Sequence, residues 1–161
     1  MLAVLKLFRV LMRSMDTHYR QVERRSRLGG AQLWALAEIA SAPQLTIGDL
    51  AGRMAIHVST ASNLVRRLEG LGLVARRREP GDRRRVALAI TAAGRRRLNA
   101  APKPTQGLLQ EALASLPRQR ISALEADLEF LLARMRHIDK RGSGTPISEI
   151  LEHHGGARAR R

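Results

Sequence analysis

Arginine is the residue type in this sequence whose side chains are best suited to chemistry. Arg76 to Arg78 and Arg83 to Arg85 lie on either side of the dipeptide Pro80-Gly81. A guanidinium group is always charged, and its planar donors can bond two oxygens of a phosphate, or the edge of a guanine, at once. From residue 46 to residue 90, nine arginines stand against four acidic residues. This excess indicates a polyanionic partner, although arginines on a strand or turn can also be simply solvated.

The whole chain shares this bias. It has 161 residues, with 29 Lys and Arg against 14 Asp and Glu, a formal net charge of +15 and a hydrophobic fraction of 44%. That fraction is too high for a disordered polycation, and the charge is too high for a typical cytosolic enzyme. A folded nucleic-acid-binding protein of one domain with helical extensions is favoured. The alternative explanation of the charge is a genome biased toward arginine codons.

Several classes of function are disfavoured by what the sequence does not contain. The chain has no cysteine, which excludes disulfides, thiolate catalysis and Cys-ligated metal centres. It has no phosphate-binding loop, no His-Glu-x-x-His motif and no plausible Ser-His-Asp set, and His153 with His154 on a Gly-rich tail makes a poor metal site. We therefore expect no enzyme activity, no cofactor and no metal.

The N-terminal stretch from Met1 to Met15 is apolar, but Lys6, Arg9 and Arg13 interrupt it and no small-residue cleavage site follows. Charges also interrupt the rest of the chain well before the roughly 18 apolar residues that a membrane span needs. We expect a cytoplasmic protein with no membrane partner. A basic amphipathic N-terminus could lie on a membrane surface, but burial against a partner helix is the favoured interpretation.

Apolar residues at helical spacing, period-2 alternation and turn residues together predict a mainly α-helical protein with one β hairpin. We expect helices at about residues 2–25, 31–40, 46–54, 59–71, 91–101, 108–116 and 121–138, and strands at about 73–79 and 83–90. Thr46 and Thr91 are suited to cap the helices that follow them. Whether Pro102 and Pro104 kink or end the preceding helix stays open. The hairpin around Pro80-Gly81 is too small to be stable alone and must lean on the helices.

The expected helix at residues 59–71 has two faces. Leu64, Val65, Leu68 and Leu71 share an apolar face. The opposite face carries small polar and basic side chains, namely Thr60, Asn63, Arg66 and Arg67. Two helices joined by a short turn and followed by a basic hairpin can place the second helix in a major groove and the hairpin at a neighbouring groove.

Two other segments have apolar faces that predict contact with another helix. Apolar residues after Pro117 recur at alternating steps of three and four, over nearly three heptads from Ile121 to Ile138. We expect this seam and the N-terminal helix to form a homodimer interface. Its predicted members are Leu5, Phe8, Met12, Leu124, Leu128 and Leu131. Residues 139–161 are typical of a basic, mostly disordered tail.

Several motifs resemble those of MarR-type winged helix-turn-helix transcriptional regulators. They are Leu50-Ala51, Ile56, Ser59-Thr60-Ala61-Ser62, Leu64-Val65, Arg67-Leu68-Glu69, Gly72-Leu73-Val74, Pro80-Gly81-Asp82-Arg83-Arg84 and Leu88-Ala89-Ile90-Thr91. The resemblance implies a mainly α fold: an N-terminal dimerisation helix (1–27), a winged helix-turn-helix DNA-binding lobe with a two-stranded β wing (28–98), C-terminal dimerisation helices (99–138) and the tail (139–161). It also implies a homodimer on a pseudopalindromic double-stranded DNA operator, with repression relieved by a small ligand in many members.

The resemblance assigns roles to individual residues. The implied DNA-binding set is Ser59, Thr60, Ser62, Asn63, Arg66 and Arg67 on the recognition helix and Arg76, Arg83, Arg84 and Arg85 in the wing. Asp82 and Arg84 match the family's Asp-x-Arg pattern, in which the arginine enters the minor groove and the aspartate supports the turn. Arg85 is either a phosphate contact or a free residue at the tip. Because a strand alternates sides, Arg76 to Arg78 cannot all face DNA.

Three further assignments follow from the same resemblance. Asn63 stands where the family often has arginine, which permits an adenine contact in place of a guanine contact. His57 stands where a Ser or Asp cap is more usual, so either Ser59 takes over the cap or the helix begins less tightly. A ligand cleft would be lined by His18, Tyr19 and Trp34, although packing in the core is the favoured role of Trp34.

The sequence therefore predicts a sequence-specific DNA-binding transcriptional regulator, a repressor released by a small-molecule effector. A non-specific architectural nucleic-acid-binding protein is the first alternative, because a net charge of +15 would suffice for it. A winged-helix scaffold that binds protein is the second. The scaffold should show little salt-dependent binding to DNA, and the architectural protein should bind all sequences equally.

Overall fold

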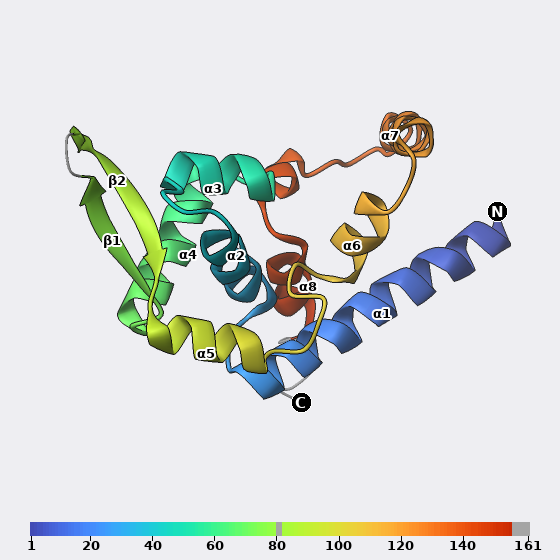
Figure 1. Cartoon of the computed structure of the whole chain (residues 1–161). Helices are drawn as coiled ribbons and strands as arrows, with labels where there is room; N and C mark the ends of the chain where they lie inside the picture. Colours follow the sequence, from blue (N-terminus) through green and yellow to red (C-terminus); the bar gives the residue numbers. More distant parts are fainter. Residues whose placement is uncertain (80–81, 156–161) are drawn as a thin grey trace.

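A computed structural model describes residues 1–79 and 82–155, without the side chains of residues 78, 79, 82–85 and 152–155. Its elements are α1 (Leu2–Ser26), α2 (Gly30–Ser41), α3 (Ile47–Met54), α4 (Val58–Gly70), β1 (Val74–Glu79), β2 (Asp82–Ile90), α5 (Ala92–Ala100), α6 (Leu108–Ala114), α7 (Arg118–Leu132), the 3-10 helix η1 (Lys140–Gly144) and α8 (Ile147–Gly155) (Figure 1). The prediction of a mainly α-helical winged helix-turn-helix with a two-stranded antiparallel wing is confirmed.

Two threonines set the starts of short helices, as the sequence predicts. The Thr46 hydroxyl accepts a hydrogen bond from the Asp49 N–H at 3.2 Å, and the Asp49 carboxylate accepts one from the Thr46 N–H at 3.0 Å. Thr91 accepts from the Gly94 N–H at 3.0 Å at the start of α5. Each bond satisfies a backbone donor that a helix leaves unpaired at its N-terminus, so α3 and α5 begin at defined residues.

The core lies where α2, α3 and α4 meet the hairpin. Its largest fully buried side chains are leucines and valines: Leu28, Leu33, Leu36, Leu50, Leu64, Leu68, Leu88, Val22 and Val65. Burying one such side chain contributes about 1.5–3 kcal/mol. Because α2 contacts α3, α4, β2 and α5, it is the helix around which the lobe packs.

The β1–β2 hairpin packs against this core. In its register Val74 pairs with Ile90 and Arg77 with Ala87. The Leu88 N–H also donates to the Leu45 carbonyl at 2.7 Å, which joins β2 to the segment before α3. A hairpin that is marginal alone is in this way held by packing and by a backbone bond to the helical lobe.

Two helical faces stay uncovered within one chain. The first half of α1 extends away from the lobe at the end opposite the hairpin, and α7 stands apart from α4 (Figure 1). The apolar side chains Leu5 and Phe8 are 42% and 39% exposed, and Leu128 on α7 is 40% exposed. None of the residues of α7 is buried. Among the described residues, no helix is long and apolar enough to cross a membrane.

The C-terminal third of the structure resolves one open alternative and differs from the expectation in two places. Pro102 and Pro104 end a helix rather than kink it, since α5 stops at Ala100 and α6 starts at Leu108. The helix predicted to reach Ile138 ends at Leu132, so the last two positions of the seam lie beyond it.

The second difference concerns residues 139–155, which the sequence predicts to be mostly disordered. They form η1 and α8, with Gly144, Pro146 and Ser148 buried. The expectation was wrong for these residues because α8 packs against α1 and α2, and a Gly-Ser-Gly sequence does not reveal such a distant contact.

Candidate nucleic-acid interface

Helix α4 presents a polar face to solvent. Its apolar face is held in the core through Ala61, Leu64, Val65 and Leu68. The prediction was wrong for Leu71, which is 55% exposed because the helix ends at Gly70 and Leu71 is its C-cap residue. On the other side Ser59, Asn63, Arg66 and Arg67 are exposed, and Thr60 and Ser62 are half-buried. The structure therefore brings all six predicted recognition-helix residues to one region, because 3.6 residues per turn separate them from the buried set.

Two of these residues contact each other. The Arg66 guanidinium donates a hydrogen bond of 3.2 Å to the amide oxygen of Asn63, three residues earlier on the same face. The bond uses one acceptor site of the Asn63 amide oxygen, and it holds a cation beside an amide that can bond a base edge.

The strand arginines point to different places, as alternation along a strand requires. Arg76 forms an ion pair with Glu69 near the C-terminal end of α4, with a distance of 3.0 Å from Nε to Oε1. Arg77 lies on the other side of β1, where it lines an open hollow of about 400 Å³ with Pro43 and Arg95. Arg76 is thus partly neutralised by the recognition helix itself, and Arg77 faces away from it.

The wing residues are placed only by their backbone. Asp82 to Arg85 form the first part of β2. Their side chains and residues 80 and 81 lie outside the described part of the chain, so the predicted roles of Asp82, Arg83, Arg84 and Arg85 remain predictions.

The start of α4 has no side-chain cap, so Ser59 does not take over the cap, and the alternative without such a cap agrees with the structure. His57 occupies the N-cap position, and no side chain caps the helix there. Instead, the His57 N–H donates to the Gly144 carbonyl at 3.3 Å, and the Thr60 hydroxyl donates to the same oxygen at 3.5 Å. Gly144 and the rest of η1 were missed by sequence reasoning. The apolar residues after Pro146 were the one local signal that this segment packs.

The three predicted ligand-pocket residues lie in two places. His18 and Tyr19 are buried neighbours on α1 with ring centroids 5.8 Å apart, and His18 Nε2 donates to the Pro104 carbonyl at 3.1 Å. Trp34 packs partly against the core and lines an open hollow of about 700 Å³ with Glu38 and Lys103. His18 and Tyr19 therefore lie at the junction of α1 with the segment before α6. Trp34 lines an open hollow that the same segment borders through Lys103, Thr105 and Gln106.

Hydrogen bonds from the Arg141 side chain and backbone lower the pKa of Asp139 to about 2. The described part of the chain contains no group of three His, Asp or Glu side chains that could hold a metal ion.

The fold and this exposed helix beside a basic hairpin define a winged helix-turn-helix protein. A family model described as the MarR family matches residues 28–85. HTH-type transcriptional regulator YdgJ of Bacillus subtilis is 31% identical over 108 residues, which are 66% of this chain and 63% of YdgJ. HTH-type transcriptional regulator Mb0904 of Mycobacterium bovis is 30% identical over 103 residues, which are 64% of this chain and 72% of that protein.

Solved structures of other proteins share this fold. The Staphylococcus aureus MepR–DNA complex has 24% identity and a TM-score of 0.56, over 81% of this chain and 96% of that one. The regulator BldR from Sulfolobus solfataricus has 26% identity and a TM-score of 0.53, over 83% and 95%. The chain belongs to the MarR family of transcriptional regulators, which confirms the predicted family and agrees with the expectation that it is not an enzyme.

Proposed function

We propose that this protein binds double-stranded DNA sequence-specifically as a homodimer and represses transcription. The observation that carries the proposal is the exposed face of α4, where Ser59, Asn63, Arg66 and Arg67 project from a helix whose other face is locked in the core. Small polar and amide side chains on a helix are the groups that read base edges in a major groove, and arginines beside them contact phosphates or guanines.

Three further observations support DNA as the partner. The chain has a net charge of +15, the arginine-rich hairpin follows α4 directly, and a structural neighbour with the same fold is a complex with DNA. A regulator of this kind acts at the chromosome, so the cytoplasm is its proposed location.

The uncovered apolar faces support the homodimer. Leu5, Phe8 and Met12 on α1 and Leu124, Leu128 and Leu131 on α7 are all at least 39% exposed in the single chain. Exposed apolar side chains at helical spacing are typical of an interface, and a two-fold dimer would present two recognition helices to a pseudopalindromic operator.

A small ligand is proposed to act at the His18–Tyr19 site. Gln110 lies near it, since a Cβ added at Gly107 would crowd both the Gln110 amide oxygen and the Tyr19 hydroxyl. That oxygen, Oε1, is buried without a hydrogen-bond partner. A buried acceptor left unpaired costs free energy, and a ligand donor could satisfy it. Occupation of this junction between α1 and α6 would alter the dimerisation helices and, with them, the spacing of the two recognition helices.

The test is selection of bound sites from fragments of the encoding genome, followed by titration of one selected duplex and one scrambled duplex. A sequence-specific regulator should bind the selected duplex at least about 10³-fold more tightly. A ratio near one would instead indicate an architectural protein. Failure to bind either duplex or heparin would indicate a protein-binding scaffold.

A further inference from the structure

The C-terminal segment returns from α7 to the start of α4. We call residues 139–151 the C-terminal strap. In Figure 1, η1 lies near one end of α3 and α8 lies beside α1 and α2, although both follow α7 in sequence. The family model stops at residue 85, so this segment lies outside it.

The strap is joined to the recognition helix through Gly144. Its carbonyl oxygen accepts from the His57 N–H at 3.3 Å and from the Thr60 hydroxyl at 3.5 Å. The two donors are the N-cap and N3 residues of α4, so one oxygen links both ends of the first helical turn. A Cβ added at Gly144 would overlap the His57 imidazole, so only glycine allows this approach without a shift.

The other end of the strap is anchored in the lobe. Ser148 is 3% exposed, and Pro146 is buried beside it. A Cβ added at Gly30 of α2 would come within 2.9 Å of the Ser148 Cβ, so α8 and α2 are in close contact. Because the strap contacts both α4, through Gly144, and α2, through Ser148, η1 is held beside the start of α4.

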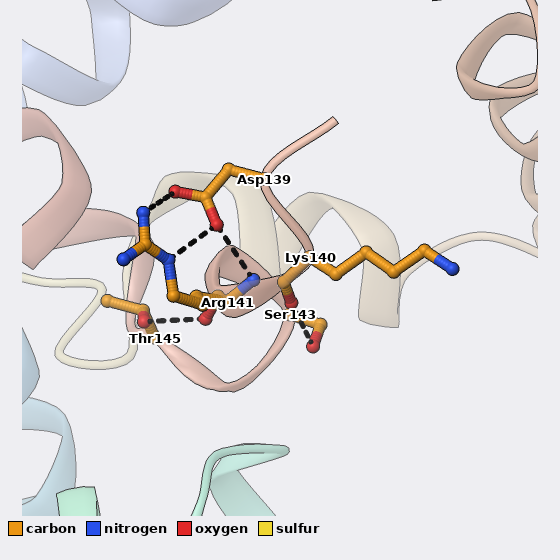
Figure 2. A network of polar contacts seen from close by, with 5 residues as sticks. All are labelled: Asp139, Lys140, Arg141, Ser143 and Thr145. Carbon is orange, nitrogen blue, oxygen red and sulfur yellow. Dashed lines mark hydrogen bonds and ion pairs between the residues drawn. The ribbon is translucent and has the colours of Figure 1, made fainter. Parts of the chain in front are cut away.

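The start of η1 carries charged side chains (Figure 2). Asp139 accepts hydrogen bonds from the Arg141 Nε, Nη2 and backbone N–H at 2.8, 2.8 and 3.1 Å, which fixes the guanidinium. The Arg141 side chain is still 91% exposed. Lys140 is exposed too and extends away from this pair in Figure 2.

We propose that the strap is part of the DNA-binding surface, with Lys140 and Arg141 contacting phosphates of the duplex next to the start of α4. The inference rests on the proposed function. A recognition helix enters the groove by its N-terminal residues, so a loop bonded to His57 and Thr60 must lie near the phosphates that border the groove. The positive charges of Lys140 and Arg141 are complementary to the phosphate backbone of DNA. They would add affinity without adding sequence preference.

Two features distinguish a DNA contact from an inhibitory cover. With the strap docked, Ser59, Asn63, Arg66 and Arg67 remain exposed, so the reading face is open. The strap also carries two exposed basic side chains, Lys140 and Arg141, whereas a segment that competes with DNA would mimic its negative charge.

The first test removes the two cations in the full chain. Lys140→Gln with Arg141→Gln should weaken binding to the selected duplex and to a mixed-sequence duplex by the same factor. It should also reduce the slope of log affinity against log salt by about 1 for each phosphate that the variant no longer neutralises. The matched control is Arg118→Gln with Arg120→Gln on α7, which removes the same charge away from α4 and should leave the slope unchanged.

The second test undocks the strap. Gly144→Val places a side chain against His57 and should lower affinity at least as far as the double glutamine variant, with thermal melting as the check of folding. If Gly144→Val does not fold, the double variant decides alone.

The outcomes separate this inference from the proposed function. If the parent protein prefers the selected duplex but the double variant has unchanged affinity and salt slope, the proposed function is supported. The proposed role of the strap is then overturned. Tighter binding by Gly144→Val would also overturn it, because the strap would then be a cover. A parent protein that binds neither duplex would contradict both the proposed function and the inference about the strap.

Discussion

The indole N–H of Trp34 donates a hydrogen bond of 3.0 Å to Glu38 Oε1, one turn further along α2. The second oxygen of the same carboxylate receives Arg53 of α3 at 3.3 Å. The half-buried tryptophan is therefore not only a packing residue: through Glu38 it belongs to a polar link between the central helix and the first helix of the helix-turn-helix.

Glu38→Ala should lower the free energy of unfolding by about 1–2 kcal/mol, because it leaves a part-buried indole donor without its acceptor. Glu38→Gln is the matched control. It keeps an oxygen for Trp34 and loses only the ion pair with Arg53, which is half-exposed and should contribute less than about 1 kcal/mol. Denaturant unfolding followed by the fluorescence of the single tryptophan measures both. Equal stability of Glu38→Ala and the parent would contradict this account.

Gly94→Ala should lower the melting temperature, with a cost of about 1–3 kcal/mol from overpacking. A Cβ at this position in α5 would overlap the Leu73 carbonyl oxygen and approach Ile90. Gly52→Ala is the matched control, because nothing lies within 4 Å of its added Cβ, and alanine inside a helix should stabilise by about 0.5–1 kcal/mol. Calorimetry of the two variants should show shifts of opposite sign.

Leu128→Asp should abolish dimerisation and DNA binding together, since it would bury an unpaired charge in the proposed α7 interface. Sedimentation at micromolar concentration measures the first effect and duplex titration the second. Glu125→Ala, an exposed change on the same helix, should alter neither greatly. A dimeric Leu128→Asp protein would place the interface elsewhere.

Binding to the selected duplex should weaken by on the order of 10³-fold or more between 50 and 200 mM salt, because a basic dimer releases many counterions from the phosphates. The measurement is a titration at several salt concentrations with the protein concentration held fixed. Affinity that hardly varies with salt would mean that arginine–phosphate contacts are not the main source of binding.

Asn63→Ala and Arg84→Ala should change DNA recognition at different operator positions. Asn63 lies on the exposed face of α4, so its loss should change the preferred base at an inner operator position. Arg84→Ala should weaken binding by about 1–3 kcal/mol per wing and relax any A·T preference at the outer flanks. The side chain of Arg84 lies outside the described residues, and its part of the prediction rests on the Asp82-x-Arg84 motif. Site selection with both variants tests the assignment, which is wrong if they alter the same position.

The elements that local sequence determines were predictable. Thr46 and Thr91 cap helices through bonds to residues three positions later, and Leu64, Val65 and Leu68 share a face because helical periodicity places them there. The hairpin between residues 74 and 90 follows from alternation and a central turn. Each of these depends on residues close together in the chain, so the sequence by itself determined them.

Tertiary structure decided the rest. Arg76 bonds Glu69, seven residues away on another element, although a strand arginine alone gives no sign of its partner. Gly144 bonds His57 and Thr60 across more than eighty residues, and its Gly-Ser-Gly surroundings favour a flexible linker when considered locally. These contacts form only when packing of α8 on α2 offsets the entropy of closing so long a loop, and local residue preferences carry no information about that balance.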